Sequence, residues 1–310
     1  MIAFLTYVLA ASVRSAIPLT LAGLGDVLSE RAGVMNLALE GQMLVGAFFG
    51  VYCSYYTGSP WLGVLGAMLA AALVGLVMAV MSVTLCANQI VVATAINIVA
   101  TGITGYMLKI FNSTAGAGGI VTVPSFNFIH IPWLSDIPFL GEVLFSYKPL
   151  VYITVLLVFA VHYYLYHTKL GLVHRSVGEN PVVADTLGLA VHRIRYGAVI
   201  LCGALCGAGG AFMSLSNLDQ FQDGMISGRG FIAFAAVIFG RWKPVGAFLA
   251  ALFFGFADAF QLRMQSMQTG ISHHLLQIIP YLCTILALTL AIGRSAGPAS
   301  DGVPYRKENS

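Results

Sequence analysis

The stretch that decides the fold is GDVLSERAGVMNLALEGQMLVGAFFG, residues 25–50. It holds three carboxylates and one arginine, and its last carboxylate, Glu40, is embedded in apolar sequence. Charged residues make up only 9% of the whole chain. A carboxylate inside an apolar span costs roughly 2.5 kcal/mol or more, so such residues face a bundle interior or a polar pathway. The stretch therefore indicates a membrane protein and suggests a conduit.

Composition predicts the fold class. Apolar residues make up 58% of the 310 residues, whereas soluble domains contain roughly 45–50% apolar and about 25% charged residues. We expect an all-α polytopic membrane protein with about eight to ten spans of about 20 residues each. The expected organisation is one transmembrane domain, residues 1–293, followed by a polar tail, residues 294–310. Residues 1–23 lack a basic region and a small-residue cleavage site, which predicts a retained first span rather than a signal peptide.

One apolar stretch is too short to cross a membrane. Residues 230–240 would extend about 16 Å as a helix, against a hydrocarbon core of about 30 Å. Glycines at 224, 228 and 230 precede or begin it, which predicts a half-helix after broken backbone. Irregular backbone at membrane depth is tolerated only where it is buried in protein or lines a cavity. The nine apolar stretches are 2–24, 33–52, 60–85, 88–111, 148–167, 195–216, 230–240, 244–262 and 274–292.

The basic residues predict the orientation. They gather in the connection 168–195 and in the tail, and both should therefore be cytoplasmic; Arg241 and Lys243 then fall on the same side. The loop 112–147 contains neither Lys nor Arg and should lie outside. Residues 25–36 could form either a loop or a break within the membrane, which leaves the side of the N-terminus open.

An internal repeat is visible, although Ala, Gly and Leu are common enough to produce one by chance. GAMLAAALVG at 66–75 aligns with GAFLAALFFG at 246–255. Upstream, Glu40-Gly41 corresponds to Arg229-Gly230. With the orientation above, the two copies cross the membrane in opposite directions. Inverted repeats are typical of transporters, and short Gly-interrupted segments at matching positions indicate the translocation site.

A short capped helix is predicted within the connection 168–195. Asn180 suits an N-cap, Pro181 the first helical position, and Gly188 the position after the C-cap. This helix is either an ordinary interfacial loop helix or a docking element for a cytoplasmic partner.

Polar residues also follow one face of stretch 88–111. Thr94, Asn97, Thr101 and Thr104 recur at steps of three, four and three residues. The face either makes hydrogen bonds between helices or forms a polar wall of a pathway.

Motifs for catalysis are absent from the sequence. It contains no G-x-x-x-x-G-K-[ST], no H-E-x-x-H and no nucleophile elbow. Cys202 and Cys206 are one helical turn apart, but no further ligand completes a metal site. We therefore expect no enzymatic activity, no cofactor and no metal, and the net charge of +3 gives no reason to expect nucleic acid as a partner.

Three segments, 29–48, 177–189 and 228–247, resemble the membrane permease subunits of binding-protein-dependent ABC importers. The nearest branch transports nucleosides and simple sugars and is related to the ribose and branched-chain amino acid permeases. The resemblance covers roughly residues 15–295, and the ERAGVMNLALEG and GRGFIA forms look most like nucleoside permeases. It implies cytoplasmic ATP-binding subunits that use ATP, a second permease subunit, identical or homologous, and an extracytoplasmic solute-binding protein. The expected location is the bacterial inner membrane, with many spans, surrounding lipid and a cytoplasmic C-terminus.

The resemblance also identifies 177–189 as the coupling helix that rests on the ATPase. Ser176, Asp185 and Thr186 depart from the small or apolar residues usual there, which puts the identity of the partner in doubt. The candidate coupling residues are Arg175, Glu179, Asn180, Pro181, Asp185 and Gly188. The candidate residues of the small-molecule pathway are Asn36, Glu40, Gln42, Thr94, Asn97, Thr101, Arg229 and Phe231.

Two alternatives differ from this importer. A secondary transporter driven by protons or sodium would use Glu40 or Asp258 as the titrating group. A membrane-embedded enzyme would need a catalytic constellation, and none is visible. The sequence names neither the nucleoside or sugar nor the second permease.

Overall fold

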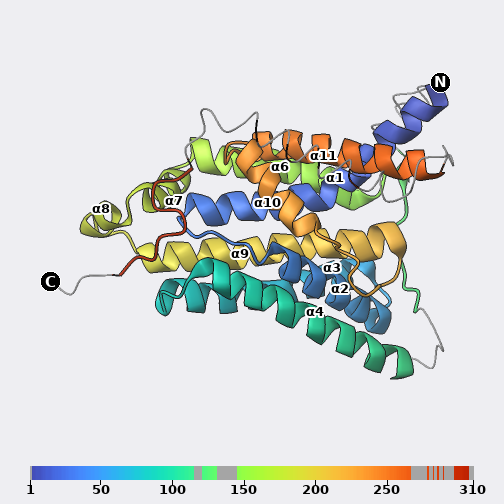
Figure 1. Cartoon of the computed structure of the whole chain (residues 1–310), viewed down its shortest axis with the longest axis horizontal. Coiled ribbons are helices and arrows are strands. Elements are labelled where there is room, and N and C mark those ends of the chain that lie inside the picture. Colours follow the sequence, from blue (N-terminus) through green and yellow to red (C-terminus); the bar gives the residue numbers. More distant parts are fainter. Residues whose placement is uncertain are drawn as a thin grey trace.

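The computed structural model describes residues 2–114, 121–130, 145–266 and 297–306, together with the single positions 278, 282, 285 and 289. Most of these residues are helical, and the helices lie roughly along the long axis of the molecule (Figure 1). The only strands in the described part are a two-residue antiparallel pair. The elements are α1 (Ile2–Arg31), α2 (Leu39–Thr57), α3 (Pro60–Ala79), η1 (Val80–Thr84), α4 (Gln89–Thr114), β1 (Ile129–His130), β2 (Ser146–Tyr147), α6 (Pro149–His167), α7 (Lys169–Glu179), α8 (Pro181–Thr186), α9 (Val191–Ala211), η2 (Phe212–Leu218), α10 (Arg229–Phe239) and α11 (Pro244–Ser266).

The chain is a polytopic all-α membrane protein. Six helical segments in the described part are long and apolar enough to cross a membrane: α1, α3 with η1, α4, α6, α9 with η2, and α11. Each of the first eight predicted apolar stretches coincides with a helix, and the short one is α10, with 11 residues. The ninth stretch, 274–292, lies outside the described residues apart from single positions.

The molecule has two distinct ends. One end carries α7, α8 and the segment 297–306, and we call it the α8 end (Figure 1). The start of α1 and the ends of α4 and α11 lie at the opposite end (Figure 1). α4 ends at Thr114, at the end of the molecule opposite the connection 168–195 (Figure 1). The side of the N-terminus, which the sequence left open, is the one opposite the α8 end.

Two pairs of helices run in opposite directions, as the predicted repeat requires. α2 begins in the middle of the molecule and runs away from the α8 end, whereas α10 begins in the middle and runs toward it (Figure 1). α3 and α11 are likewise antiparallel in the bundle (Figure 1). Residues 25–36 are not a simple loop, because α1 continues to Arg31 before the chain turns.

Close packing around α9 forms the centre of the bundle. This helix packs against α1, α2 and α3 and is mostly buried, whereas most of α4 is not. A Cβ atom at Gly210 would lie 2.0 Å from the carbonyl oxygen of Met43 in α2. Small residues permit such close backbone approach between membrane helices, where van der Waals packing drives association.

Gly210→Ala should therefore destabilise the bundle, because α2 and α9 would have to separate; overpacking of this kind costs about 1–3 kcal/mol. Gly197→Ala is the matched control, because Gly197 lies on the same helix with no atom within 4 Å of the added carbon. The measurement is the thermal unfolding midpoint in detergent. We expect a lower midpoint for Gly210→Ala and an equal or higher one for Gly197→Ala; equal midpoints for both variants would contradict the packing argument.

Candidate functional site

Two helices begin inside the bundle and meet at Glu40. Glu40 lies in the first turn of α2, and its carboxylate reaches the first turn of α10. Oε1 accepts a hydrogen bond from the Gly228 N–H, and Oε2 accepts one from the Gly230 N–H, both at 2.7 Å. The N-terminus of a helix presents unpaired N–H groups and a partial positive charge, and both favour an anion. Glu40 therefore caps α10 from a different helix.

The backbone at the start of α10 permits this approach. Ser227 and Gly228 have φ angles of 50° and 83°, in the left-handed region, so the chain turns sharply into the helix. A Cβ atom at Gly230 would lie 2.4 Å from the backbone nitrogen of Glu40. Glycine at 230 is thus required by the contact between the two helix starts.

Asn97 of α4 satisfies the broken backbone before α2. Its Oδ1 accepts the N–H of Gly41 at 2.8 Å, and its Nδ2 donates to the carbonyl of Leu37 at 3.0 Å. Unpaired backbone groups at membrane depth cost several kcal/mol each, so side chains that pair with them make a discontinuous helix possible. One amide side chain therefore stabilises both sides of the start of α2.

Asn36 lies within the irregular segment before α2 and forms hydrogen bonds that hold it. Its Oδ1 accepts the N–H of Ala38 at 3.1 Å, and its Nδ2 lies 3.1 Å from both Gln42 Oε1 and Cys202 Sγ. The side chains of Asn36 and Gln42 are fully buried. These two candidate pathway residues therefore contact protein in this structure.

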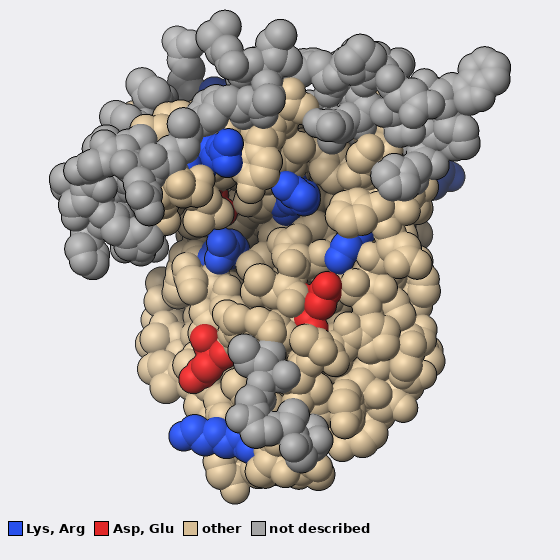
Figure 2. Space-filling model, turned by 90° about the vertical axis from the view of Figure 1, so that its right-hand side faces the viewer, with Lys and Arg blue, Asp and Glu red and all other residues tan. Residues whose placement is uncertain are grey.

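Arg229 pairs with Asp258 rather than with Glu40. Its Nη2 lies 3.4 Å from Asp258 Oδ2, and its Nη1 donates to the carbonyl of Ile226 at 3.2 Å. Arg229 and Asp258 line a cavity of about 360 Å³, and a neighbouring cavity of about 630 Å³ shares Ser15 and Asn217 with it. Figure 2 views the molecule from the end opposite α8 and shows Lys and Arg side chains gathered around a hollow.

The remaining candidate pathway residues lie on exposed faces of the chain. Thr94 and Thr101 are exposed, and their hydroxyls donate to the carbonyls of Ile90 and Asn97 in their own helix. Phe231 is 52% exposed. On the polar face of α4, Asn97 bonds between helices, whereas the threonine hydroxyls bond within α4.

The capped helix in the connection is present as predicted. α8 begins after Asn180, whose Oδ1 accepts the N–H of Val183 at 3.1 Å, and Pro181 takes the first helical position. Gly188 has a φ of 79°. The preceding helix, α7, was not predicted, although its buried residues Gly171, His174 and Val177 recur at three-residue steps.

The other candidate coupling residues take different positions. The guanidinium of Arg175 lies 4.8 Å from the centre of the Tyr166 ring, against α6. Glu179 ends α7 and lies 3.9 Å from Arg31. Asp185 is on α8 itself.

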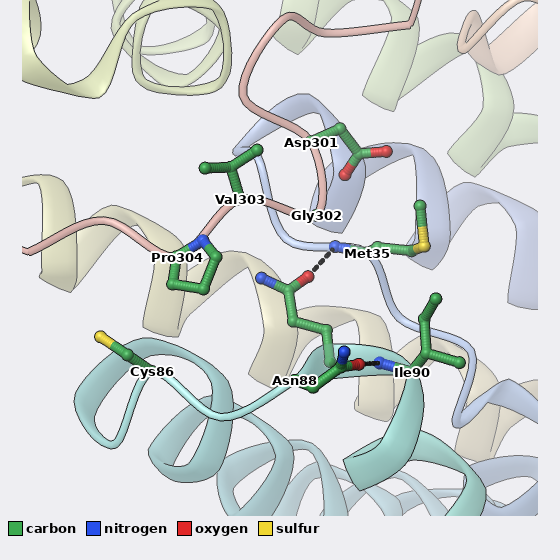
Figure 3. A pocket seen from close by; sticks show the side chains of 9 residues that line it. Met35, Cys86, Asn88, Ile90, Asp301, Gly302, Val303 and Pro304 are labelled. Atoms are coloured by element: carbon green, nitrogen blue, oxygen red, sulfur yellow. Dashed lines mark hydrogen bonds between the residues drawn. The ribbon is translucent and has the colours of Figure 1, made fainter.

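Residues 297–306, which belong to the predicted polar tail, pack against α7 and α9. Ser300 bonds to the carbonyl of Gly178, and the Val303 carbonyl accepts a hydrogen bond from Arg195 at 3.2 Å. Burial raises the pKa of Asp301 to about 7, against the opposing effects of the Gly302 N–H and Arg195. Figure 3 shows the cavity of about 490 Å³ that this segment forms with residues 86–90 and Met35.

The sequence of the chain matches a known protein family. Residues 8–288 match the family described as the permease component of the branched-chain amino acid transport system. The chain belongs to this permease family. No solved structure matches the chain.

Three relatives of this permease align along almost its whole length. The guanosine ABC transporter permease NupQ of Bacillus subtilis is 40% identical, over 98% of this chain and 97% of its own. The nucleoside ABC transporter permease NupC of Lactococcus lactis is 37% identical, over 94% and 93%. The putative glucose ABC transporter permease TsgC13 of Haloferax volcanii is 36% identical, over 94% and 93%. The resemblance noted in the sequence is thereby confirmed.

The contact that joins the half-helices of this permease should be sensitive to its carboxylate. In Glu40→Gln the amide oxygen can accept from one of the two N–H groups at the start of α10, but the amide NH₂ group cannot accept from the other. In Glu40→Ala both N–H groups are left unpaired. Each unpaired buried group costs about 1–3 kcal/mol. We expect the unfolding midpoint in detergent to fall in the order wild type, Glu40→Gln, Glu40→Ala.

Asp223→Asn is the control for this series, because Asp223 is an exposed carboxylate in the segment before α10 and should leave the midpoint unchanged. Glu40→Ala with the stability of the wild type would show that the cap is dispensable.

Proposed function

We propose that the chain is the nucleoside-translocating permease subunit of an ATP-driven importer. The observation that carries this proposal is the alignment with guanosine and nucleoside permeases over 94% or more of the chain. The sequence has no motif for cradling ATP phosphates, so a partner subunit would hydrolyse the ATP. The permease would supply the path, and the partner would supply the driving force.

The path is proposed to run beside the start of α2. Thr94 and Thr101, on the exposed face of α4, would form a polar wall, with Phe231 providing an aromatic surface for a base. Asn36, Gln42 and Asn97 would act mainly by holding the broken backbone open to this wall. Glu40 and Arg229 would fix the start of α10, the half-helix that borders the path.

The α8 end is proposed to face the cytoplasm, because basic residues gather there. ATP-binding subunits would dock on α8, and a solute-binding protein would deliver the substrate at the opposite end. A second permease chain would complete the path. Two different permeases of Bacillus subtilis, 40% and 24% identical to this chain, carry the name of a guanosine transporter, which supports a pair of non-identical permeases.

Transport in proteoliposomes tests the function. The permease would be purified with the chains that copurify with it and reconstituted with the solute-binding protein. We expect uptake of labelled guanosine that requires ATP inside the vesicle and fails with a non-hydrolysable analogue. Competition by excess glucose, with no competition by other nucleosides, would indicate a sugar permease. Uptake by the permease alone, driven by a proton or sodium gradient, would overturn the ATP-driven importer.

A second test addresses coupling through α8. Gly188 needs a left-handed backbone, which a β-branched residue adopts only with strain. Gly188→Val should therefore misshape the end of α8 and lower uptake per ATP hydrolysed by about tenfold, with little loss of folded protein. Gly188→Asn is the matched control, since Asn tolerates this conformation, and it should transport normally. Normal uptake by Gly188→Val would show that the shape of α8 is not needed to couple ATP hydrolysis to transport.

A further inference from the structure

The end of α1 contacts the junction between α7 and α8 through the backbone. A Cβ atom at Gly178 would lie 2.2 Å from the carbonyl oxygen of Arg31 and 3.1 Å from the nitrogen of Gly33. Glu179 follows Gly178 and immediately precedes Asn180, the N-cap of α8. A displacement of α8 therefore reaches the end of α1 with no flexible side chain in between.

The side chain of Arg31 extends from this junction to the turn between α10 and α11. Its Nε donates to the carbonyl of Trp242 at 2.9 Å, and its Nη2 donates to the carbonyl of Arg241 at 3.4 Å. Nη1 lies 3.9 Å from Glu179 Oε1. One guanidinium thus contacts both Glu179, the last residue of α7, and the turn at the end of α10. A planar group with donors in fixed directions suits such a bridging position.

The turn that receives these hydrogen bonds is strained. Arg241 and Trp242 have φ angles of 58° and 52°, a conformation that residues with side chains rarely adopt. The indole N–H of Trp242 also donates to the carboxylate of Glu30, one residue before Arg31. Strained backbone persists only where its surroundings hold it, and here the last two residues of α1 provide the hold.

The contacts form a closed circuit. From Arg31, one route runs along residues 32–38 to Glu40 at the start of α2. The other runs through the Arg31 guanidinium to the turn at 241–242 and back along α10 to its first residues. Both routes end at the hydrogen bonds between Glu40 and the N–H groups of Gly228 and Gly230. A shift at Arg31 would therefore act on both half-helices together.

We propose that Arg31 is a positioning residue that transmits the movement of α8 to the α10 half-helix through the carbonyls of Arg241 and Trp242. The inference rests on the proposed importer function, in which α8 receives the movement of the ATPase. The Glu179 side chain is 56% exposed, so its ion pair with Arg31 contributes little to stability. The importance of Arg31 lies in the geometry of its hydrogen bonds rather than in its charge.

Arg31→Lys tests this geometry in the assembled transporter. Lysine keeps the charge but presents one compact ammonium group, which cannot reproduce the directions of Nε and Nη2. We expect ATP hydrolysis within about twofold of the wild type and nucleoside uptake per ATP lowered at least about tenfold, the scale of losing a hydrogen bond from a charged donor. Arg193→Gln is the matched control, because Arg193 is an exposed arginine near the α8 end, and it should leave uptake per ATP unchanged.

A second measurement reports movement rather than transport. In a background without other accessible cysteines, Ser227→Cys places an exposed thiol just before α10. In an otherwise wild-type transporter, ATP should change the rate at which a maleimide modifies this thiol by several-fold. The Arg31→Lys variant should lose that response while the ATPase remains bound.

The outcomes separate the two proposals. A wild-type transporter that imports no nucleoside with its ATPase refutes the proposed function itself. A wild-type transporter that imports, together with an Arg31→Lys variant that imports equally well per ATP and keeps the maleimide response, refutes the role of Arg31. A third variant, Arg31→Gln, would remove the charge as well as the hydrogen bonds. Even if that variant fails to assemble, Arg31→Lys still tests the role of Arg31, because it retains the charge.

Discussion

The structure depends on how backbone groups are satisfied where helices begin inside the membrane. Lipid offers no partner for an N–H or C=O group, so a half-helix can exist only if the protein itself supplies partners. Glu40 supplies two acceptors to the first turn of α10, and Asn97 supplies a donor and an acceptor around the start of α2. These two side chains pair with backbone groups at the borders of the irregular segments 32–38 and 219–228.

This arrangement also explains why a charge is tolerated at the centre of the molecule. A carboxylate within an apolar region is unfavourable when isolated, but Glu40 is placed where two N–H groups and the positive end of a helix already need an anion. The charge of Arg229 is instead compensated by a carboxylate, that of Asp258 on α11. The two charged residues of the repeat are therefore equivalent in position but not in partner.

Local signals allowed much of the fold to be predicted from the sequence. Glycines before residue 230 indicated the half-helix α10, and Asn180, Pro181 and Gly188 indicated α8, because caps and turns act on neighbouring residues. Contacts between distant residues left no such signal: 211 positions separate Arg31 from Trp242. The contact between Arg195 and Ser300 likewise joins residues 105 positions apart, and nothing in the sequence indicated it.

The anchoring of Arg195 has a consequence for biosynthesis. Its side chain is 1% exposed, and its guanidinium contacts the Ser300 hydroxyl and the Val303 carbonyl. The ribosome makes Ser300 105 residues after Arg195, which at common elongation rates takes roughly 5 to 20 seconds. During that interval a cation at the base of α9 is already in place without these partners. The contacts at the base of α9 are therefore completed only after residues 300–303 have been made.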